Sequence, residues 1–200
     1  DIPGNQVCQP FDLTIPADFS TATFPLVAAA VTQSELAIQN LDFSDEQGDK
    51  AVFALLEKMG VEILRNGSTT LIRPHGRLHG ADLDLNATPD ALPAIAVAAA
   101  AAEGTTIIRN VAQARIKETD RIACMTRELR KMGISVEEHP DGMTITGGQL
   151  SGTAVNSYKD HRIAMALAVA GLAAEGETII RDAECVAVTY PKFIEDFNRL

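Results

Sequence analysis

The sequence has no tryptophan, few aromatic residues and only three cysteines among its 200 residues. Cys8, Cys124 and Cys185 are odd in number and far apart, and no CxxC pair is present. This pattern argues against a disulfide framework and against a zinc site. It favours reduced thiols and therefore a cytoplasmic location.

Long hydrophobic runs are also missing. The two longest, Ala91–Ala102 and Ile163–Ala174, contain 12 residues each. A helix that spans a bilayer needs about 20 apolar residues. We therefore expect no membrane contact and interpret both runs as buried helices.

Positive charge is scarce. Lysine and arginine total 17 against 27 aspartate and glutamate residues, which gives a net charge of −10. A nucleic-acid surface needs a clustered excess of cations, so nucleic acid is not expected as a partner. A small anion can still bind wherever a few cations converge. The hydrophobic share of 46% is sufficient for a sizeable core.

What the chain does have is an internal repeat. Leu26–Asn40, Val97–Asn110 and Ala168–Asp182 are three versions of one phrase, about 70 residues apart. Each reads as a helix of small residues, a turn and a short β-branched strand. A second phrase follows each copy, at Leu55–Ile63, at Leu129–Val136 and, where the chain stops, at Phe197–Leu200.

The repeats predict an α+β (mixed α/β) fold made of βαβαββ units. We expect a connector from a preceding domain at residues 1–12 and one three-repeat domain at 13–200, with units at about 13–80, 81–150 and 151–200. Hairpins are expected around Asn66-Gly67 and Asp141-Gly142. The third unit is truncated before its hairpin. Units of this kind bury their helices only by sharing a core.

Charged residues open three of the predicted helices. Asp90 follows Thr88 and Pro89, a typical cap and first helical position. Lys117, Glu118 and Arg121 surround Thr119, which is expected to cap the next helix. Asp160, His161 and Arg162 precede an almost wholly apolar stretch.

The cations at these helix starts need an explanation, because a helix N-terminus disfavours positive charge. Since the units are copies, their helix starts are expected to meet around the shared core. Asp90, Lys117, Glu118, Arg121 and Arg162 would then line one cleft. Two guanidinium groups and an ammonium suit a phosphate or carboxylate, and two carboxylates supply general acids and bases.

Several stretches make the chain similar to the carboxyl-terminal half of the 5-enolpyruvylshikimate-3-phosphate (EPSP) synthase family, the 3-phosphoshikimate 1-carboxyvinyltransferases. The most specific are IKETDRI at 116–122 and DHRIAMA at 160–166. Others are ADFSTATFPLVAAAV, QGD, LEKMG, DLNATPDALPAIAVAAA, RNVAQARIKETDRI, ELRKMG, KDHRIAMALAV and ECVAVTYPKFIEDF. Together they cover nearly all of residues 13–200.

The resemblance implies inside-out α/β domains of three βαβαββ units each. It implies a transferase of the shikimate pathway, which serves chorismate and aromatic amino acid biosynthesis. The enolpyruvyl group of phosphoenolpyruvate moves to the 5-hydroxyl of shikimate 3-phosphate, and phosphate is released. No metal or organic cofactor is expected. The implied partners are the two substrates and the amino-terminal domain of the same enzyme.

The resemblance also implies roles for individual residues. Asp90 contacts shikimate hydroxyls and accepts the proton of the attacking one, and Glu118 exchanges a proton with the phosphoenolpyruvate methylene carbon. Lys117 bridges the substrates, while Arg121 and Arg162 clamp phosphoenolpyruvate. A further shikimate 3-phosphate contact falls on Gln113, where the family often has asparagine.

The chain departs from the family pattern in two respects. Val188 stands where some members have a lysine that adds to the phosphoenolpyruvate site, and Lys192 does not match that position. The other half of the enzyme has no counterpart here, so the chain alone is expected to be inactive or very weak.

Two other functions are considered. One is enolpyruvyl transfer to UDP-N-acetylglucosamine, although KETDR with DHRIAMA is not expected there. The other is a non-enzymatic module of the same fold, which the buried-looking cations disfavour. A zinc site at His75 and His79 is also disfavoured, because Pro74, Gly76 and Gly80 interrupt any helix there.

Overall fold

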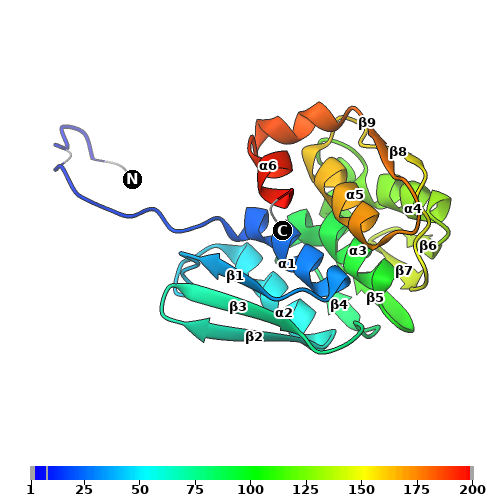
Figure 1. Cartoon of the computed structure of the whole chain (residues 1–200). Coiled ribbons are helices and arrows are strands. Elements are labelled where there is room, and N and C mark those ends of the chain that lie inside the picture. Colours follow the sequence, from blue (N-terminus) through cyan, green and yellow to red (C-terminus); the bar gives the residue numbers. More distant parts are fainter. Residues whose placement is uncertain (1–2, 8, 199–200) are drawn as a thin grey trace.

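Three helices of small residues lie side by side in the middle of the computed structural model (Figure 1). They are α1 (Phe19–Thr32), α3 (Leu92–Ala101) and α5 (His161–Ala173). The structure describes residues 3–7 and 9–198. α3 is buried over almost its whole length, as expected of a helix that is apolar on all sides. The first apolar run is therefore a buried helix, as predicted, and the second is largely buried up to Ala170, beyond which Leu172 is half exposed.

The second unit has the complete predicted order of strand, helix, strand, helix and hairpin. Its elements are β4 (Asp82–Asp84), η2 (Pro89–Ala91), α3, β5 (Thr105–Arg109), η3 (Ala112–Ile116), α4 (Arg121–Lys131), β6 (Ser135–His139) and β7 (Gly142–Thr146). β4 runs parallel to β5, and β7 pairs antiparallel with both β5 and β6. The sheet order is therefore β4-β5-β7-β6.

The first unit follows the same plan but begins at its helix. After α1 come β1 (Leu36–Gln39), η1 (Gly48–Lys50), α2 (Ala51–Lys58), β2 (Val61–Asn66) and β3 (Thr69–Pro74). The predicted hairpin is confirmed, although its two loop residues are Gly67 and Ser68, because Asn66 still pairs with Thr69. The sheet order is β1-β3-β2. The expected first strand is replaced by an extended segment. Within the described residues, two hydrogen bonds tie it to Asn40, directly after β1: from the backbone N–H of Ala17 to Asn40 O (2.8 Å) and from the Asn40 side chain to Ile15 O (2.9 Å).

The third unit contains β8 (Ala154–Asn156), α5, β9 (Ile179–Arg181), η4 (Ala183–Val188) and α6 (Phe193–Phe197). β8 runs parallel to β9, as β4 does to β5. The last two residues of the Phe197–Leu200 phrase lie outside the described residues. Among the described residues, the third sheet has two strands, so β9 lacks the neighbour that β7 gives to β5.

The ends of the repeated phrases show that the units are equivalent. Asn40, Asn110 and Asp182 close the three copies, and each has a left-handed backbone with φ between 56° and 64°. Asparagine and aspartate adopt this conformation more readily than other residues with a side chain. The same residue type at the same point therefore reflects one turn used three times.

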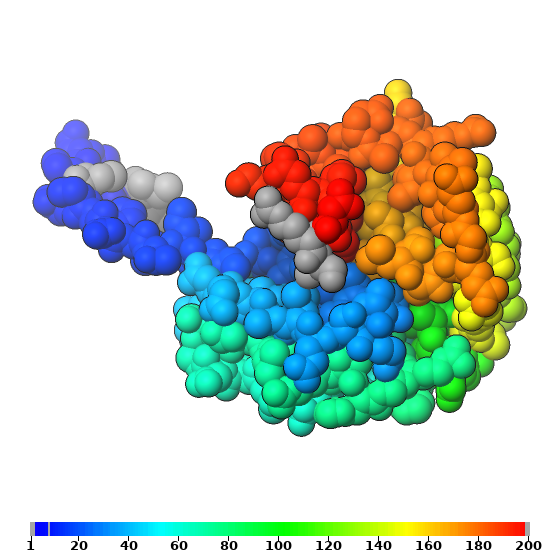
Figure 2. Space-filling view, in the orientation of Figure 1, coloured from blue at the N-terminus to red at the C-terminus, as the bar shows by residue number. Residues whose placement is uncertain are grey.

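The segment before α1 extends away from the body of the molecule (Figures 1 and 2). Its apolar side chains Val7, Phe11, Leu13 and Ile15 are largely exposed to solvent. Its described residues up to Ile15 do not pack against the domain, and none of them lies in a strand. Within the described residues, no helix is both long and apolar enough to cross a bilayer.

Gly147 and Gly148, directly after β7, allow a test of how closely the backbone there approaches the end of α3. A Cβ atom on Gly147 would lie 1.9 Å from Ala102 O, whereas one on Gly148 would lie 3.9 Å from its nearest neighbour. Gly147→Ala is expected to lower the free energy of unfolding by about 1–3 kcal/mol, because backbone must move. Gly148→Ala is the matched control, with an expected change below about 0.5 kcal/mol. Urea unfolding followed by circular dichroism measures both, and equal midpoints would refute the close approach.

Candidate active site

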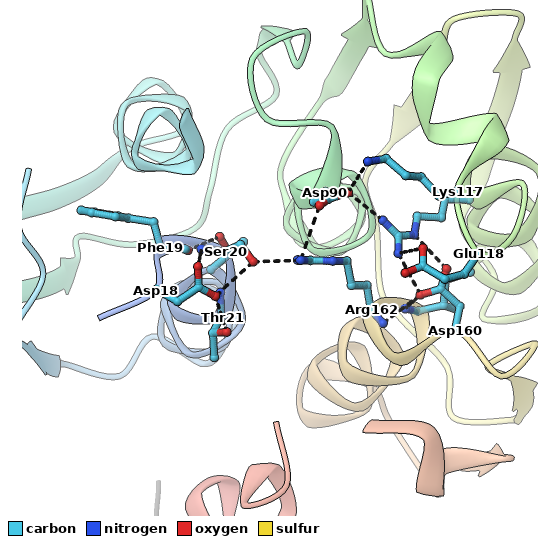
Figure 3. A network of polar contacts seen from close by, with 12 residues as sticks. Asp18, Phe19, Ser20, Thr21, Asp90, Lys117, Glu118, Asp160 and Arg162 are labelled. Atoms are coloured by element: carbon cyan, nitrogen blue, oxygen red, sulfur yellow. Dashed lines mark hydrogen bonds and ion pairs between the residues drawn. The ribbon is translucent and has the colours of Figure 1, made fainter. Parts of the chain in front are cut away.

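The starts of the three central helices converge on one site (Figure 3). Asp18 caps α1 by accepting hydrogen bonds from the backbone N–H groups of Ser20 and Thr21. Asp160 caps α5 in the same way, through the N–H groups of Arg162 and Ile163. Asp90 lies in the η2 turn that leads into α3. Three positive helix ends therefore point toward the same region.

Asp90 lies at the centre of this site and contacts three cations. Its Oδ1 atom is 3.1 Å from Lys117 Nζ and 2.9 Å from a terminal nitrogen of Arg121. Its Oδ2 atom is 3.5 Å from a terminal nitrogen of Arg162. The same nitrogen of Arg162 donates a hydrogen bond to Ser20 Oγ at 2.9 Å, which joins the first unit to the second and third.

Arg121 is the most buried cation of the site, with 1% of its side chain exposed. Its Nε donates to Asp160 Oδ2 at 2.8 Å, and a terminal nitrogen donates to Glu118 Oε2 at 2.6 Å. The Asp160 side chain is fully buried. The anions around Arg121 are thus three carboxylates of the chain itself, which offset the unfavourable helix-end position of the guanidinium.

The cations lower the pKa of two carboxyl groups. Burial acts to raise the pKa of Asp90, but the charges of Arg162, Lys117 and Arg121 outweigh it, and the pKa lies below its ordinary value. Burial likewise opposes ionisation of Asp160, and hydrogen bonds from Arg121, Arg162 and Thr119 more than compensate, so its pKa is also lowered. Both groups are therefore carboxylates at neutral pH.

The geometry brings together five of the six site residues named from the sequence: Asp90, Lys117, Glu118, Arg121 and Arg162. Gln113 lies apart from this cluster. Its amide donates to Asn86 O at 3.1 Å, and it lines a separate shallow hollow with Asp84 and Asp141.

One predicted helix cap is wrong, and a second has the predicted position but lacks a side-chain hydrogen bond: Thr88 is the N-cap residue of η2, with Pro89 after it. Asp120, not Thr119, caps α4, by accepting from the N–H of Ala123 at 2.9 Å. A carboxylate is the stronger acceptor, and Thr119 is thereby left to donate to Asp160 Oδ2 at 3.1 Å. The Thr88 side chain makes no capping hydrogen bond; its carbonyl accepts from the N–H of Ala91 in the η2 turn instead.

Sequence reasoning missed three polar residues of the site, Asp18, Ser20 and Asp49, and named Asp160 only as a charged residue that opens a helix. Asp18 and Asp160 each directly precede a helix of small residues, which is a recognisable cap pattern. Asp49 lies in η1, where burial and the negative charge of Asp90 raise its pKa. No local pattern identified Ser20, because its role depends on a residue 142 positions away.

The weaker sequence signals lie elsewhere. His75 pairs with Glu62 at 2.9 Å, and the described part of the chain holds no group of three metal-ligating side chains. Val188 is exposed at the end of η4. Cys124 and Cys185 are free thiols, while Cys8 lies outside the described residues.

Comparison with known proteins identifies the family. The family model described as EPSP synthase (3-phosphoshikimate 1-carboxyvinyltransferase) matches residues 1–197. The chain belongs to the EPSP synthase family. Within this family, the chain is 53% identical over 194 residues to the 3-phosphoshikimate 1-carboxyvinyltransferase of Ruminiclostridium cellulolyticum. The matched region covers 97% of the chain and 46% of that relative. It is 49% identical to the enzyme of Methanocella arvoryzae, with 98% of the chain and 47% of the relative covered.

A solved structure gives the same result. EPSP synthase from Acinetobacter baumannii superposes with a TM-score of 0.84 at 31% identity, over 92% of this chain and 46% of that one. The predicted fold class and the resemblance to this EPSP synthase family are confirmed. The chain spans about half the length of the relatives that it matches.

Asp160→Asn tests the buried pair with Arg121. Asparagine still caps a helix, so the substitution mainly removes charge. At pH 7 we expect a loss of about 3–5 kcal/mol of unfolding free energy. Because the folded-state pKa of Asp160 is lowered, its contribution is present above the ordinary value of 3.8 and disappears as the pH falls through the folded value. Urea unfolding between pH 7 and pH 3 should show the two proteins converging in acid; a constant difference would contradict the pairing.

Proposed function

We propose that this chain is one part of an enzyme that transfers the enolpyruvyl group of phosphoenolpyruvate to the 5-hydroxyl of shikimate 3-phosphate and releases phosphate. The observation that carries the proposal is the cluster of Lys117, Arg121 and Arg162 around Asp90, with Glu118 beside it. The names of the relatives supply the reaction, and the cluster supplies groups suited to it.

The cations are suited to bind the phosphoenolpyruvate anion. Arg121 and Arg162 offer planar guanidinium groups, which pair with carboxylate or phosphate through two parallel hydrogen bonds. Arg162 is only 14% exposed and is already oriented by Ser20 and Asp90. Lys117 is a point charge that contacts the same oxygen of Asp90 as Arg121 does, and it is suited to bridge the two substrates. Cations fixed before the reaction stabilise the charge that develops during it.

The carboxylates are suited to move protons. The 5-oxygen of shikimate 3-phosphate attacks C2 of phosphoenolpyruvate while Asp90 accepts its proton and Glu118, in its acid form for this step, gives a proton to the methylene carbon. The resulting tetrahedral intermediate then loses phosphate, which leaves with the proton held by Asp90, and the methyl group returns a proton to Glu118. Asp90 is ionised at neutral pH because of its cations, so it is ready to accept the proton as the substrate anions draw those cations away.

The charge balance of the cluster supports a need for a second part. Three cations face the carboxylates of Asp90, Glu118 and Asp160, so the cluster carries no net positive charge by itself. Two multiply charged anions require more cations than this. The amino-terminal domain of the same enzyme is the proposed source of those cations. We expect the chain alone to bind the substrates weakly and to be inactive or very slow.

Transfer to UDP-N-acetylglucosamine and a purely structural role are the alternatives. The KETDR and DHRIAMA segments weigh against the first, and buried charges gathered at three helix starts weigh against the second. The cytoplasmic location expected from the cysteine pattern belongs to the same proposal.

A chimera tests the function. Residues 1–200 replace the matching segment of the Ruminiclostridium cellulolyticum relative, and phosphate release is measured with both substrates. We expect turnover that needs phosphoenolpyruvate and shikimate 3-phosphate together, and at least about 1,000-fold less from the 200 residues alone. Full activity of the isolated chain would contradict the need for a second part, and activity with UDP-N-acetylglucosamine would favour the alternative enzyme.

Asp90→Asn in the chimera tests the proton acceptor. We expect kcat to fall by about 100- to 10,000-fold, the usual effect of losing a general base. Asp82→Asn is the matched control, because Asp82 is an exposed aspartate that also pairs with an arginine, Arg109 at 2.6 Å. Its kcat should stay within about twofold of the unsubstituted chimera. A normal kcat for Asp90→Asn would remove Asp90 from the mechanism.

A further inference from the structure

A second buried carboxylate, outside the site just described, lies on the same helix as Arg121. Glu128 of α4 is fully buried, and its two oxygens accept hydrogen bonds from three groups. Lys131 Nζ is 2.7 Å from Oε2 and 2.9 Å from Oε1, the Asn156 backbone N–H donates to Oε2 at 3.1 Å, and the Tyr158 hydroxyl donates to Oε1. Two of the three donors are Asn156, the last residue of β8, and Tyr158, in the segment between β8 and α5.

That segment is a strained turn. Tyr158 and Lys159 are consecutive residues with φ of 56° and 61°, a conformation that side chains disfavour. Asn156 Oδ1 accepts from the N–H of Tyr158 at 2.6 Å, and Ser157 Oγ accepts from the N–H of Lys159 at 3.0 Å. Asp160 and Arg162 follow immediately, so the path of this turn decides where both side chains lie.

α4 holds the turn at two points. Arg121 and Glu128 are seven residues apart, two turns of one helix face. Arg121 binds Asp160 after the turn, while Glu128 binds Asn156 and Tyr158 before and within it. A second contact from α4 reinforces the same turn, since Arg127 donates to the Tyr158 hydroxyl at 3.1 Å.

We propose that Glu128 is a positioning residue: through Asn156 and Tyr158 it fixes the turn that places Asp160 and Arg162 for phosphoenolpyruvate binding. The assignment of phosphoenolpyruvate rests on the proposed function. Glu128 touches neither Asp90 nor Arg162 and acts only through the turn. A buried carboxylate is a poor device for stability alone, since an apolar side chain of similar size usually serves as well or better.

Glu128→Gln in the chimera is the test, because glutamine keeps the size of the side chain but cannot accept all of these hydrogen bonds. We expect the KM for phosphoenolpyruvate to rise about tenfold, with kcat and the KM for shikimate 3-phosphate within about threefold. Tyr158→Phe, which removes the hydrogen bonds of the hydroxyl with Glu128 and Arg127 and keeps the Glu128–Lys131 pair, should raise the same KM about threefold. Glu137→Gln, on the exposed side of β6, is the control and should change neither.

The readout separates positioning from mere stability. Loss of folded protein lowers the apparent rate but leaves KM unchanged, so an unchanged KM for phosphoenolpyruvate in both Glu128→Gln and Tyr158→Phe overturns the proposal. An equal rise in both KM values also overturns it. If Glu128→Gln fails to fold, the Tyr158→Phe result decides.

Hydrogen–deuterium exchange keeps the test independent of activity. Amides of residues 156–163 should exchange at least about tenfold faster in Glu128→Gln than in the unsubstituted chimera, while those of α3 stay unchanged. An unsubstituted chimera that releases no phosphate would end the proposed function. Exchange at 156–163 would then decide the positioning role, and unchanged exchange there would refute it.

Discussion

The buried guanidinium of Arg121 is the interaction on which the site depends. It joins the first turn of α4 to the cap of α5 through Asp160, and to the start of α3 through Asp90. A charge at 1% exposure is tolerated only when its hydrogen-bonding capacity is satisfied by anions nearby. Arg121 therefore holds three separate segments in one arrangement. Lys117 and Arg162 contact the same carboxylate of Asp90 that Arg121 contacts.

The repeat explains why this interaction is available. Each unit places a helix of small residues in the centre, and the helices pack side by side with their starts at the same end. A polar side chain at the start of any unit thereby meets those of the others. The three units contribute different groups: Ser20 and Asp18 from the first, Asp90 and Arg121 from the second, and Asp160 with Arg162 from the third. One structural phrase, used three times, yields an asymmetric site.

The features that sequence alone predicted are those set by local pattern or by the repeat. Both hairpins, the buried helices and the meeting of Asp90, Arg121 and Arg162 follow from period, turn residues and the equivalence of units. The misses depend on competition between neighbours or on distant partners. Asp120, a stronger acceptor one residue after Thr119, caps α4 in its place. Ser20 gains its role from Arg162, which lies in another unit. The expected first strand is not found in the described residues before α1, most of which do not pack against the domain, and the spacing of apolar residues in the sequence does not reveal this.

The site is preorganised yet electrically balanced, and these two properties belong together. Asp90 holds Lys117, Arg121 and Arg162 at fixed distances, much as a bound anion would, so the cations do not need to be gathered when a ligand arrives. A ligand that binds the arginines competes with Asp90 for them. In the proposed reaction, loss of those contacts raises the basicity of Asp90 at the step that needs a proton acceptor. The proposal therefore couples anion binding to proton transfer through one carboxylate, which a positively charged pocket without Asp90 could not achieve.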